Sequence, residues 1–323
     1  RSSDLPSPGE APRASPGPFT PHRWKERSSV RSYKWYVPWL LVGPAVVWVA
    51  VFALWPFVNT VVLSFTNARP LTGGTFVAFD NYAALFSDAR VWTSLGTTLA
   101  FTVACVPLLT FLPLLLALLV HRMIPGISFF RTTFYFPVIA SVVVVALIFQ
   151  WLFDSRGVIN ETLQFLGLVQ GPLPFLASRW GLIFTAVVLT VWKGLGYYMV
   201  VYLAALANVG TELHEAAAMD GASAWRRFWS VTVPGVRGAM FLVSALITVS
   251  GMRVFSELYV LSKGSGGPGG EASSLVMLVQ QVGSGLNGRL GYASALSVLL
   301  FLFTVGPLIL VAYLNNRPDS NAR

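Results

Sequence analysis

Residues 215–236, EAAAMDGASAWRRFWSVTVPGV, form a charged, glycine-containing stretch between two long apolar runs. These runs, residues 181–206 and 237–261, are long enough for an α-helix to cross the ~30 Å hydrocarbon layer of a bilayer. A polar element between two membrane spans calls for an explanation, so it is the starting point for interpreting the rest of the chain.

The composition of the 323 residues indicates a membrane protein. Hydrophobic residues make up 55% and charged residues only 11%, with a mean hydropathy of +0.66. A soluble domain carries roughly 25% charged residues. Lipid offers no hydrogen-bond partner to a backbone amide, so each span must be a helix. We therefore predict an all-α, multi-pass protein of the plasma or inner membrane.

The chain divides into three predicted regions. Residues 1–37 begin with a segment of disordered composition and end in basic and aromatic residues, which suit either a membrane surface or a solvated tail. Residues 38–314 form the membrane domain and residues 315–323 a cytoplasmic tail. Six spans are expected, at about residues 38–63, 94–120, 131–153, 181–206, 237–261 and 291–314.

Irregular structure is expected at three places. Pro107 and Pro113 predict a kink or a break in the second span. FVAFDNYAALFSDARVW, within residues 64–93, predicts a strand followed by a helix on the outer surface. SKGSGGPGGEASS, within residues 262–290, predicts a flexible, turn-rich loop.

The distribution of Lys and Arg predicts that both termini are cytoplasmic. With the N-terminus inside, fourteen of these residues fall on inner segments and six on outer loops. The positive-inside rule then places residues 207–236 in the cytoplasm. Without residues 1–37 the count is seven against six, so this segment provides most of the bias. The net charge of +9 thus follows the loops and indicates membrane topology rather than nucleic-acid binding.

The polar stretch itself predicts two short helices. Alanine is the best helix former, so residues 211–221 suit one helix, capped by Thr211 and ended by Gly221 in the left-handed conformation. Residues 223–233 suit a second helix that Pro234 ends. A stiff element with a hinge fits either a docking site for a cytoplasmic partner or a simple connection between two spans.

The sequence carries no catalytic or metal-binding motif. It has no GxxxxGK[ST] phosphate loop, HExxH, CxxC or GxSxG pattern, so we expect neither a cofactor nor an enzyme active site in this chain. The single cysteine, Cys105, lies in an apolar run and suits a buried thiol.

Few charges lie within the spans, and each costs about 2.5–3.5 kcal/mol at mid-span on insertion scales. Lys193 lies in the fourth span beside Trp192 and Tyr197, while Arg253 and Glu257 lie one helical turn apart in the fifth. These five residues are candidates for a substrate pathway. A structural ion pair, snorkelling side chains or aromatic packing would explain them equally well. A proton- or sodium-driven carrier normally needs intramembrane carboxylates or broken helices as ion sites, and the sequence shows only Glu257, so we expect the driving energy to come from another chain.

The polar stretch resembles the EAA loop in permease subunits of ATP-binding-cassette (ABC) importers. That pattern is EAA, three residues, Gly, nine residues, and Ile-x-Leu-Pro. Glu215, Ala216, Ala217 and Gly221 match it, and Val231–Pro234 closes it, with Val233 in place of the commoner Leu.

Two further segments are similar to the carbohydrate and glycerol-phosphate branch of this family. FVAFDNYAALF, residues 76–86, is similar to F-x-G-x-x-NY, with Ala78 in the usual place of Gly. FSELYVLSKGSGGPGG, residues 255–270, is similar to FD-x-x-YVLT-x-GGP, with Ser256 in the place of Asp. The subunit type resembles the larger of the two maltose permease chains.

The resemblance implies a type I importer fold and a set of partners. A dimer of ATPase subunits would hold ATP and Mg and receive the coupling element on the cytoplasmic side. A second homologous permease would complete the pathway, and an extracytoplasmic binding protein would deliver a sugar, oligosaccharide or glycerol-phosphate-like solute. The residues that the resemblance assigns to ATPase coupling are Glu215, Ala216, Ala217, Met219, Asp220, Gly221 and Pro234.

Other functions fit the sequence less well. An ABC permease for phosphate or amino acids would lack the GGP-type loop at residues 263–270. A membrane enzyme would need clustered carboxylates at the membrane surface, and the acids here are scattered. A self-contained carrier lacks the ion-site carboxylates described above.

The predicted topology can be tested with a single introduced thiol. A cysteine placed in the polar stretch by Ala218→Cys should react with a membrane-impermeant maleimide only from the cytoplasmic side. Labelling from the outside of intact cells would invert the topology.

Overall fold

The computed structural model describes residues 34, 36–121 and 125–315. Most of the N-terminal segment 1–37 and of the tail 315–323 lies outside the described residues, and so do the predictions made for them. The chain divides into two units, Arg1–Ala53 and Leu54–Arg323. Within the described residues the secondary structure is helical, apart from two isolated β-bridges.

The first unit contains one described helix, α1 (Tyr36–Val49), which leads into a π-helical turn at Ala50–Leu54. Its side chains are almost all apolar, and large ones such as Trp39, Leu40 and Trp48 are exposed. Exposed apolar side chains all around a helix suit contact with lipid.

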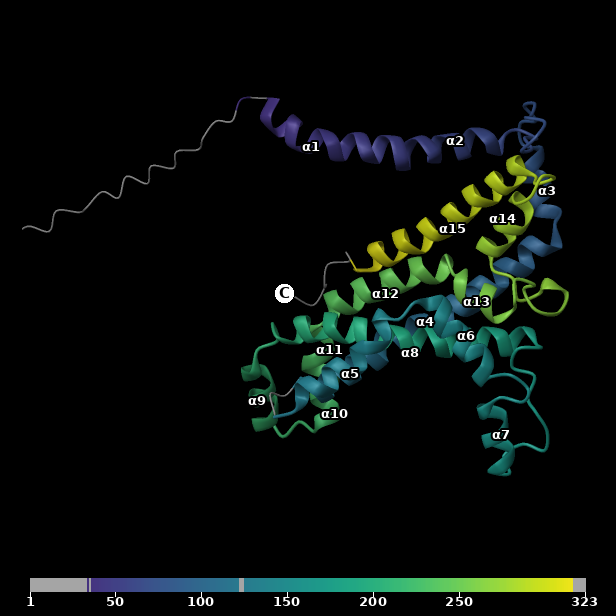
Figure 1. The fold of residues 1–323 in the computed structure, drawn as a ribbon. Helices are drawn as coiled ribbons and strands as arrows, with labels where there is room; N and C mark the ends of the chain where they lie inside the picture. The colour runs from purple at the N-terminus through teal and green to yellow at the C-terminus, as the bar shows by residue number, and fades with distance from the viewer. Residues whose placement is uncertain (1–33, 35, 122–124, 316–323) are drawn as a thin grey trace, which may run out of the picture. The chain divides into compact units, whose positions relative to one another are not determined.

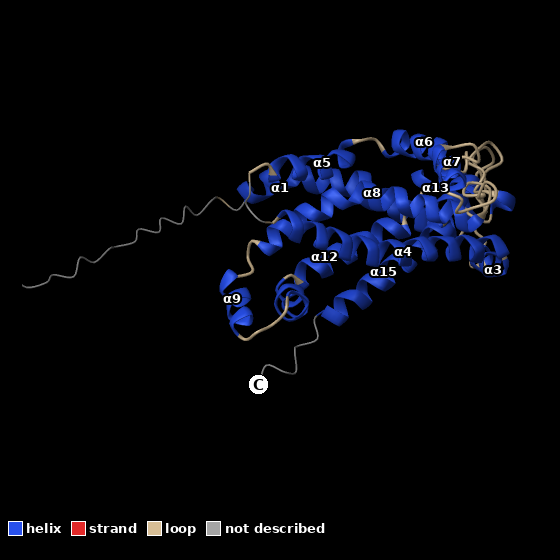
Figure 2. Ribbon diagram, turned by 90° about the horizontal axis from the view of Figure 1, so that it is seen from below, coloured by secondary structure: helices blue, strands red, loops and turns tan. Residues whose placement is uncertain are grey.

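The second unit contains the rest of the helices. Figures 1 and 2 show the short helices α9 and α10 at one end, and α3, α7 and most of the loops at the other. The helices are α2 (Trp55–Ser64), α3 (Asp80–Ser87), α4 (Ala89–Val120), α5 (Ile127–Ile139), α6 (Val142–Leu152), α7 (Val158–Phe165), α8 (Arg179–Leu206), α9 (Thr211–Met219), α10 (Ala224–Arg227), a π turn (Phe228–Thr232), α11 (Val233–Gly235), α12 (Arg237–Met252), α13 (Ser256–Leu261), a 3-10 turn (Pro268–Gly270), α14 (Leu275–Gly283) and α15 (Leu290–Asn315).

The predicted spans match the long apolar helices in number, if bent pairs are counted as single spans. In the described part of the chain, four helical stretches are long and apolar enough to cross a membrane: Trp39–Ser64, Ala89–Val120, Arg179–Leu206 and Leu290–Ile309. Two bent pairs, Ile127–Ile139 with Val142–Leu152 and Ala224–Gly235 with Arg237–Met252, bring the total to as many as six. The fold is therefore that of an all-α membrane protein.

The second span differs from its prediction. It begins at Ala89 rather than at residue 94, and α4 runs unbroken through Pro107 and Pro113. A proline removes one helical hydrogen bond, but helices packed against α4 on several sides hold it together. The break is not found there, and the alternative, a kink, stays a prediction.

Two spans that were predicted as continuous are broken instead. The third span turns by 95° at Ala140 and Ser141, between α5 and α6. The fifth ends its first part at Met252, and three residues follow before α13 begins at Ser256. Non-helical backbone is tolerated at membrane depth only where its polar groups find partners within the protein.

The core of the second unit forms where α4, α8 and α12 pack together. Phe101, Leu189 and Tyr202 are fully buried there. The helices approach closely at two glycines. A side chain at Gly196 would collide with the Phe134 carbonyl, and one at Gly251 would lie 2.8 Å from Thr102 Oγ1. Small residues at such crossings are how membrane helices gain contact area, because lipid supplies no hydrophobic drive between them.

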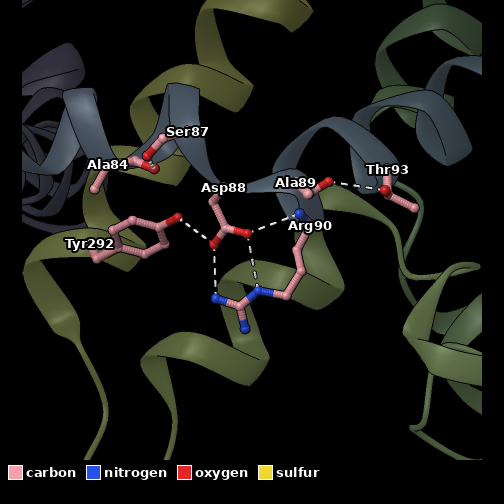
Figure 3. Close-up of polar contacts among 7 residues, drawn as sticks. All are labelled: Ala84, Ser87, Asp88, Ala89, Arg90, Thr93 and Tyr292. Atoms are coloured by element: carbon pink, nitrogen blue, oxygen red, sulfur yellow. Dashed lines mark hydrogen bonds and ion pairs between the residues drawn. The ribbon is translucent and has the colours of Figure 1, made fainter.

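A second cluster of buried side chains lies where α3, α14 and α15 meet the start of α4. Asp88 fixes this junction. Its carboxylate accepts a bidentate pair of bonds from Arg90, at 3.2 and 2.8 Å, and a bond of 2.8 Å from the Tyr292 hydroxyl (Figure 3). The hydrogen bonds from Arg90 hold the pKa of Asp88 at about 2, well below its usual value.

The loop over residues 262–290 is more ordered in structure than the predicted flexible segment. It has successive left-handed glycines, as its composition indicates, but it also contains α14. Two side chains of α4 hold it: Thr97 donates to the Glu271 carbonyl at 2.9 Å, and Thr98 accepts from the Leu275 amide at 3.0 Å. The glycine-rich composition pointed to a loop, so the sequence did not predict α14, whose first turn is buried.

The predicted strand and helix at residues 64–93 are found in reduced form. The strand is limited to the bridges Thr66–Phe76 and Arg69–Gly73, while the helix is α3. Between them Ala78 has a φ of +48°. This left-handed conformation favours glycine, which is the residue that the resemblance has at this position.

Ala78→Gly should therefore stabilise the protein. The left-handed conformation costs alanine about 1–2 kcal/mol, and the greater freedom of glycine in the unfolded chain offsets about 0.4–1 kcal/mol of the relief. A net gain of up to about 1 kcal/mol should appear as a higher midpoint of thermal unfolding in detergent. Ala83→Gly, in the exposed middle of α3, is the matched control and should lose roughly 0.5–1 kcal/mol. Equal losses in both variants would contradict strain at Ala78.

Candidate functional site

The polar stretch forms a compact helical element with a defined turn. Helix α9 ends at Met219, and Gly221 follows with a φ of +73°, as predicted. The Gly221 amide donates to the Ala218 carbonyl at 3.0 Å and the Ala222 amide donates to the Ala217 carbonyl at 2.9 Å. This pair of bonds is a Schellman motif, which satisfies the carbonyls at the end of a helix and fixes the direction in which the chain leaves.

The start of α9 differs from its prediction. The N-cap residue is Gly210, which has no capping side chain, and Thr211 is already the first helical residue. Helix α9 thus has a firm C-terminal end and an uncapped N-terminal one. Glu215 lies exposed on it, and among the described residues its carboxylate has no ion-pair partner. A free carboxylate on a short rigid helix is available to a partner.

The second helix of the stretch begins as predicted but ends later. The Ser223 hydroxyl accepts from the Arg226 amide at 3.3 Å and so caps α10. The chain then makes the π turn Phe228–Thr232 and continues through Pro234, which lies in the first turn of α11. Proline is tolerated there because a first-turn amide has no helical partner. The bend of 72° toward α12 comes only at Val236.

Aromatic side chains gather on α10 and on the π turn. The rings of Trp225 and Phe228 stack at 6.0 Å, and Trp229 meets Trp225 edge-on at 5.7 Å. Trp225 and Trp229 remain exposed. Exposed tryptophans next to arginines suit the boundary between lipid and water.

A cavity of about 730 Å³ lies beside this element, bordered by α9, α10 and the end of α4. Its polar groups come from His121, Thr211, His214, Glu215, Arg227 and Thr232. The other residues of α9 and its turn that the resemblance assigns to ATPase coupling are mostly exposed. Ala216, Met219, Asp220 and Gly221 are exposed, while Ala217 is partly buried. The arrangement presents a rigid helix and an adjoining hollow.

A second cavity, of about 320 Å³, lies among the spans at the level where the third and the fifth are broken. Four of the five predicted pathway residues line it: Lys193, Tyr197, Arg253 and Glu257. Its polar groups alternate with aromatic rings of Tyr198 and Phe255. A cavity with both kinds of group can hydrogen-bond the hydroxyls of a small polar molecule and stack on its apolar face.

Lys193 has a structural partner in this cavity. Its ammonium group donates to the Val138 carbonyl at 2.9 Å and reaches the Pro137 carbonyl at 3.5 Å. Both carbonyls belong to the last turn of α5, where the break at Ala140 removes their helical partners. A cation is favoured at the C-terminal end of a helix. The ammonium group thus replaces backbone hydrogen bonds that the broken span has lost.

Gln150 makes a similar contact at the end of α13 that lies away from the break. Its side-chain amide donates to the Val260 carbonyl at 3.1 Å and to the Leu261 carbonyl at 3.3 Å, at the end of α13. The sequence analysis missed Gln150, although a lone amide in the apolar run 142–152 was a signal. Thr190 was also missed. It lines the cavity one helical turn before Lys193, and its buried hydroxyl has no partner among the described residues.

The structure corrects two of the sequence interpretations. Trp192 does not line the cavity; its ring packs 5.8 Å from that of Phe149, and it faces an apolar groove between α4 and α8. Arg253 and Glu257 do not share a helix face, because Arg253 lies in the break and Glu257 in α13. Within the described part of the chain no ion pair joins them, so the ion-pair interpretation is wrong as well.

Comparisons with known proteins match this architecture. A family model described as "Binding-protein-dependent transport system inner membrane component" matches residues 72–319. The lactose transport system permease protein LacF of Rhizobium radiobacter is 30% identical over 280 residues, covering 85% of this chain and 93% of that protein. The arabinooligosaccharides transport system permease protein AraP of Halalkalibacterium halodurans is 30% identical over 269 residues, covering 82% and 83%.

A solved structure has the same fold. The crystal structure of a bacterial ABC transporter involved in the import of the acidic polysaccharide alginate contains a chain with a TM-score of 0.74 and 21% identity. The match covers 88% of this chain and 96% of that one. A structure of the alginate transporter with a pentasaccharide-bound periplasmic protein gives 0.75 at 21% identity.

Replacing Lys193 should lower the stability of the folded protein without reducing its insertion into the membrane. Lys193→Met removes a cation from a span, so insertion should be undiminished. The carbonyls of Val138 and Pro137 are left unpaired, which should lower the free energy of unfolding by about 1–3 kcal/mol. Thermal unfolding in detergent measures the loss. Lys193→Arg keeps a donor and should lose less. A Met variant as stable as the wild type would show that the bond to Val138 does not hold the break.

Proposed function

We infer that this chain, which belongs to the family of binding-protein-dependent transport system inner membrane components, forms half of the import pathway for a sugar or an oligosaccharide. Membership of the family makes it a multi-pass permease subunit of the plasma membrane, a transport component and not an enzyme. The named relatives that transport lactose, arabinooligosaccharides and multiple sugars support the carbohydrate class of solute.

The cavity at the two broken spans is the observation that carries this proposal. Its volume of about 320 Å³ lies at the small end of ligand cavities, which suits one sugar unit or half of a shared site. Lys193, Arg253 and Glu257 offer donors and acceptors to sugar hydroxyls or to an anionic substituent, and Tyr197 offers an aromatic ring. A second homologous permease would provide the other wall of the pathway.

The coupling element supports the energy source that the sequence resemblance implies. We propose that α9 docks on an ATPase subunit, with the Glu215 carboxylate pairing with a cation there. ATP and Mg would be held by a dimer of such subunits. Closing of that dimer would pull on α9, and the Schellman turn at Gly221 would transmit the pull through α10 and α11 to the fifth span. An extracytoplasmic binding protein would bring the solute to the opposite end.

Purification of the tagged chain in mild detergent tests the proposed assembly. Mass spectrometry should find three partners with the wild-type chain: an ATPase with a phosphate loop, a second permease and a binding protein. Glu215→Ala should lose at least about tenfold of the ATPase, because one partner of a docked charge pair is gone. Gly221→Pro should act likewise, since proline cannot adopt a positive φ. The second permease should remain in both.

Glu212→Ala is the matched control, because Glu212 is exposed in the first turn of the same helix. It should retain the ATPase and full uptake. Loss in Glu212→Ala equal to that in Glu215→Ala would point to damage of α9 rather than to a docking contact. A wild-type chain that purifies alone would remove the basis for the importer.

A further inference from the structure

A third cavity, of about 510 Å³, lies at the end of the second unit opposite α9, near the start of α3 and of α15. It shares no residue with the cavity around Lys193. Its walls are mainly polar. The residues that line it are Asn67, Ala68, Arg69, Thr72, Gly73, Gly74, Thr75, Asn81, Arg289 and Tyr292.

The cavity carries two positive charges and no negative one. Arg69 and Arg289 are exposed at its rim, and no carboxylate lines it. Asp88, the hydrogen-bond partner of the lining residue Tyr292, is already bound by the Arg90 guanidinium (Figure 3). In the ranges that the structure describes, the Asp88–Arg90 pair is the only ion pair. Both rim guanidinium groups are therefore open to an anion from outside the chain.

The walls are rigid. Asn67 Oδ1 accepts from the Thr75 amide at 2.7 Å, and Asn81 Nδ2 donates to the carbonyls of Ser64 and Thr66 at 2.8 Å each. The loop is fastened to α15, because the Gly291 amide donates to the Ala68 carbonyl at 3.1 Å. A pre-formed wall lowers the entropy lost on binding.

Arg289 is itself held in position. Its guanidinium carbon lies 4.4 Å from the centre of the Tyr292 ring, within the range of a cation–π contact. The Tyr292 ring is fixed in turn by the bond from its hydroxyl to Asp88. Arginine at a fixed position presents a planar fork of N–H donors that matches a carboxylate.

We propose that this cavity receives an acidic side chain from the surface of the extracytoplasmic binding protein, with Arg69 and Arg289 as its partners. The inference rests on the proposed function, in which such a protein docks at this end. Two observations favour a protein over the transported solute. The cavity is separate from the one among the spans, and its cations lie exposed at the rim, where a docking surface reaches them first.

Photo-cross-linking in the native cells tests the contact. A benzophenone amino acid at Thr72, on the rim, should cross-link to the binding protein through a peptide that contains Asp or Glu. The double variant Arg69→Gln, Arg289→Gln should reduce this cross-link at least about tenfold, as is typical when charged partners are removed from a docking site. Higher salt should reduce the yield of the wild-type cross-link, because it screens the charge pair. The low yield that remains in the double variant should change little, because that variant lacks both guanidinium groups.

Arg156→Gln is the matched control, because Arg156 is an exposed arginine at the same end that does not line the cavity. It should cross-link like the wild type. Arg289→Lys keeps the charge but loses the fork, and should fall between the two. The amount of chain in the membrane and its elution in gel filtration show whether each variant folds.

Four results would overturn the proposal. A binding protein that co-purifies but does not cross-link from Thr72 would remove this contact and leave the proposed function standing. A cross-link that is unchanged in the double variant, or that falls equally in Arg156→Gln, would do the same. A chain with no binding protein in either experiment would refute the contact and the proposed function together.

Discussion

The constraint on which this structure depends is that every backbone polar group at membrane depth must have a partner. Two spans are interrupted there, and a break exposes carbonyls that neither lipid nor the helix can satisfy. Lys193 supplies a missing donor from another helix, at Val138 beside the break of the third span. This bond allows irregular backbone to line a cavity between the spans. The site exists because both spans are interrupted at this level and because Lys193 replaces a hydrogen bond that the third span has lost.

Local hydrogen bonds also hold each of the two ends of the second unit. At one end the Schellman turn at Gly221 fixes the path from α9 to α10, and short helical pieces continue the chain to α12. At the other end, Asp88, Arg90 and Tyr292 tie the start of α4 to α15. The broken spans lie between these fixed ends. The cavity thus lies where both spans are interrupted.

The sequence alone predicted much of this fold, because apolar runs of span length and the left-handed glycine at Gly221 have few alternatives. It also named Lys193, Tyr197, Arg253 and Glu257, together with Trp192, as candidates for a pathway, since charges among the spans are costly, and the first four line one cavity. The breaks were placed wrongly. Proline chemistry pointed to Pro107 and Pro113, where neighbouring helices hold α4 intact, whereas the chain turns at Ala140 and Ser141, just after Pro137 and at the N-cap residue of α6. The misplacement of Trp192, one residue from Lys193, has the same origin: which side of a helix faces the cavity depends on tertiary packing.

The bond between Lys193 and Val138 also bears on how the protein is made. Its two residues lie 55 positions apart, and the carbonyl belongs to the earlier span. The third span is therefore synthesised before the lysine that bonds to it. A hairpin of the third and fourth spans contains both partners of this bond, so it can satisfy the broken end of α5 without the rest of the chain.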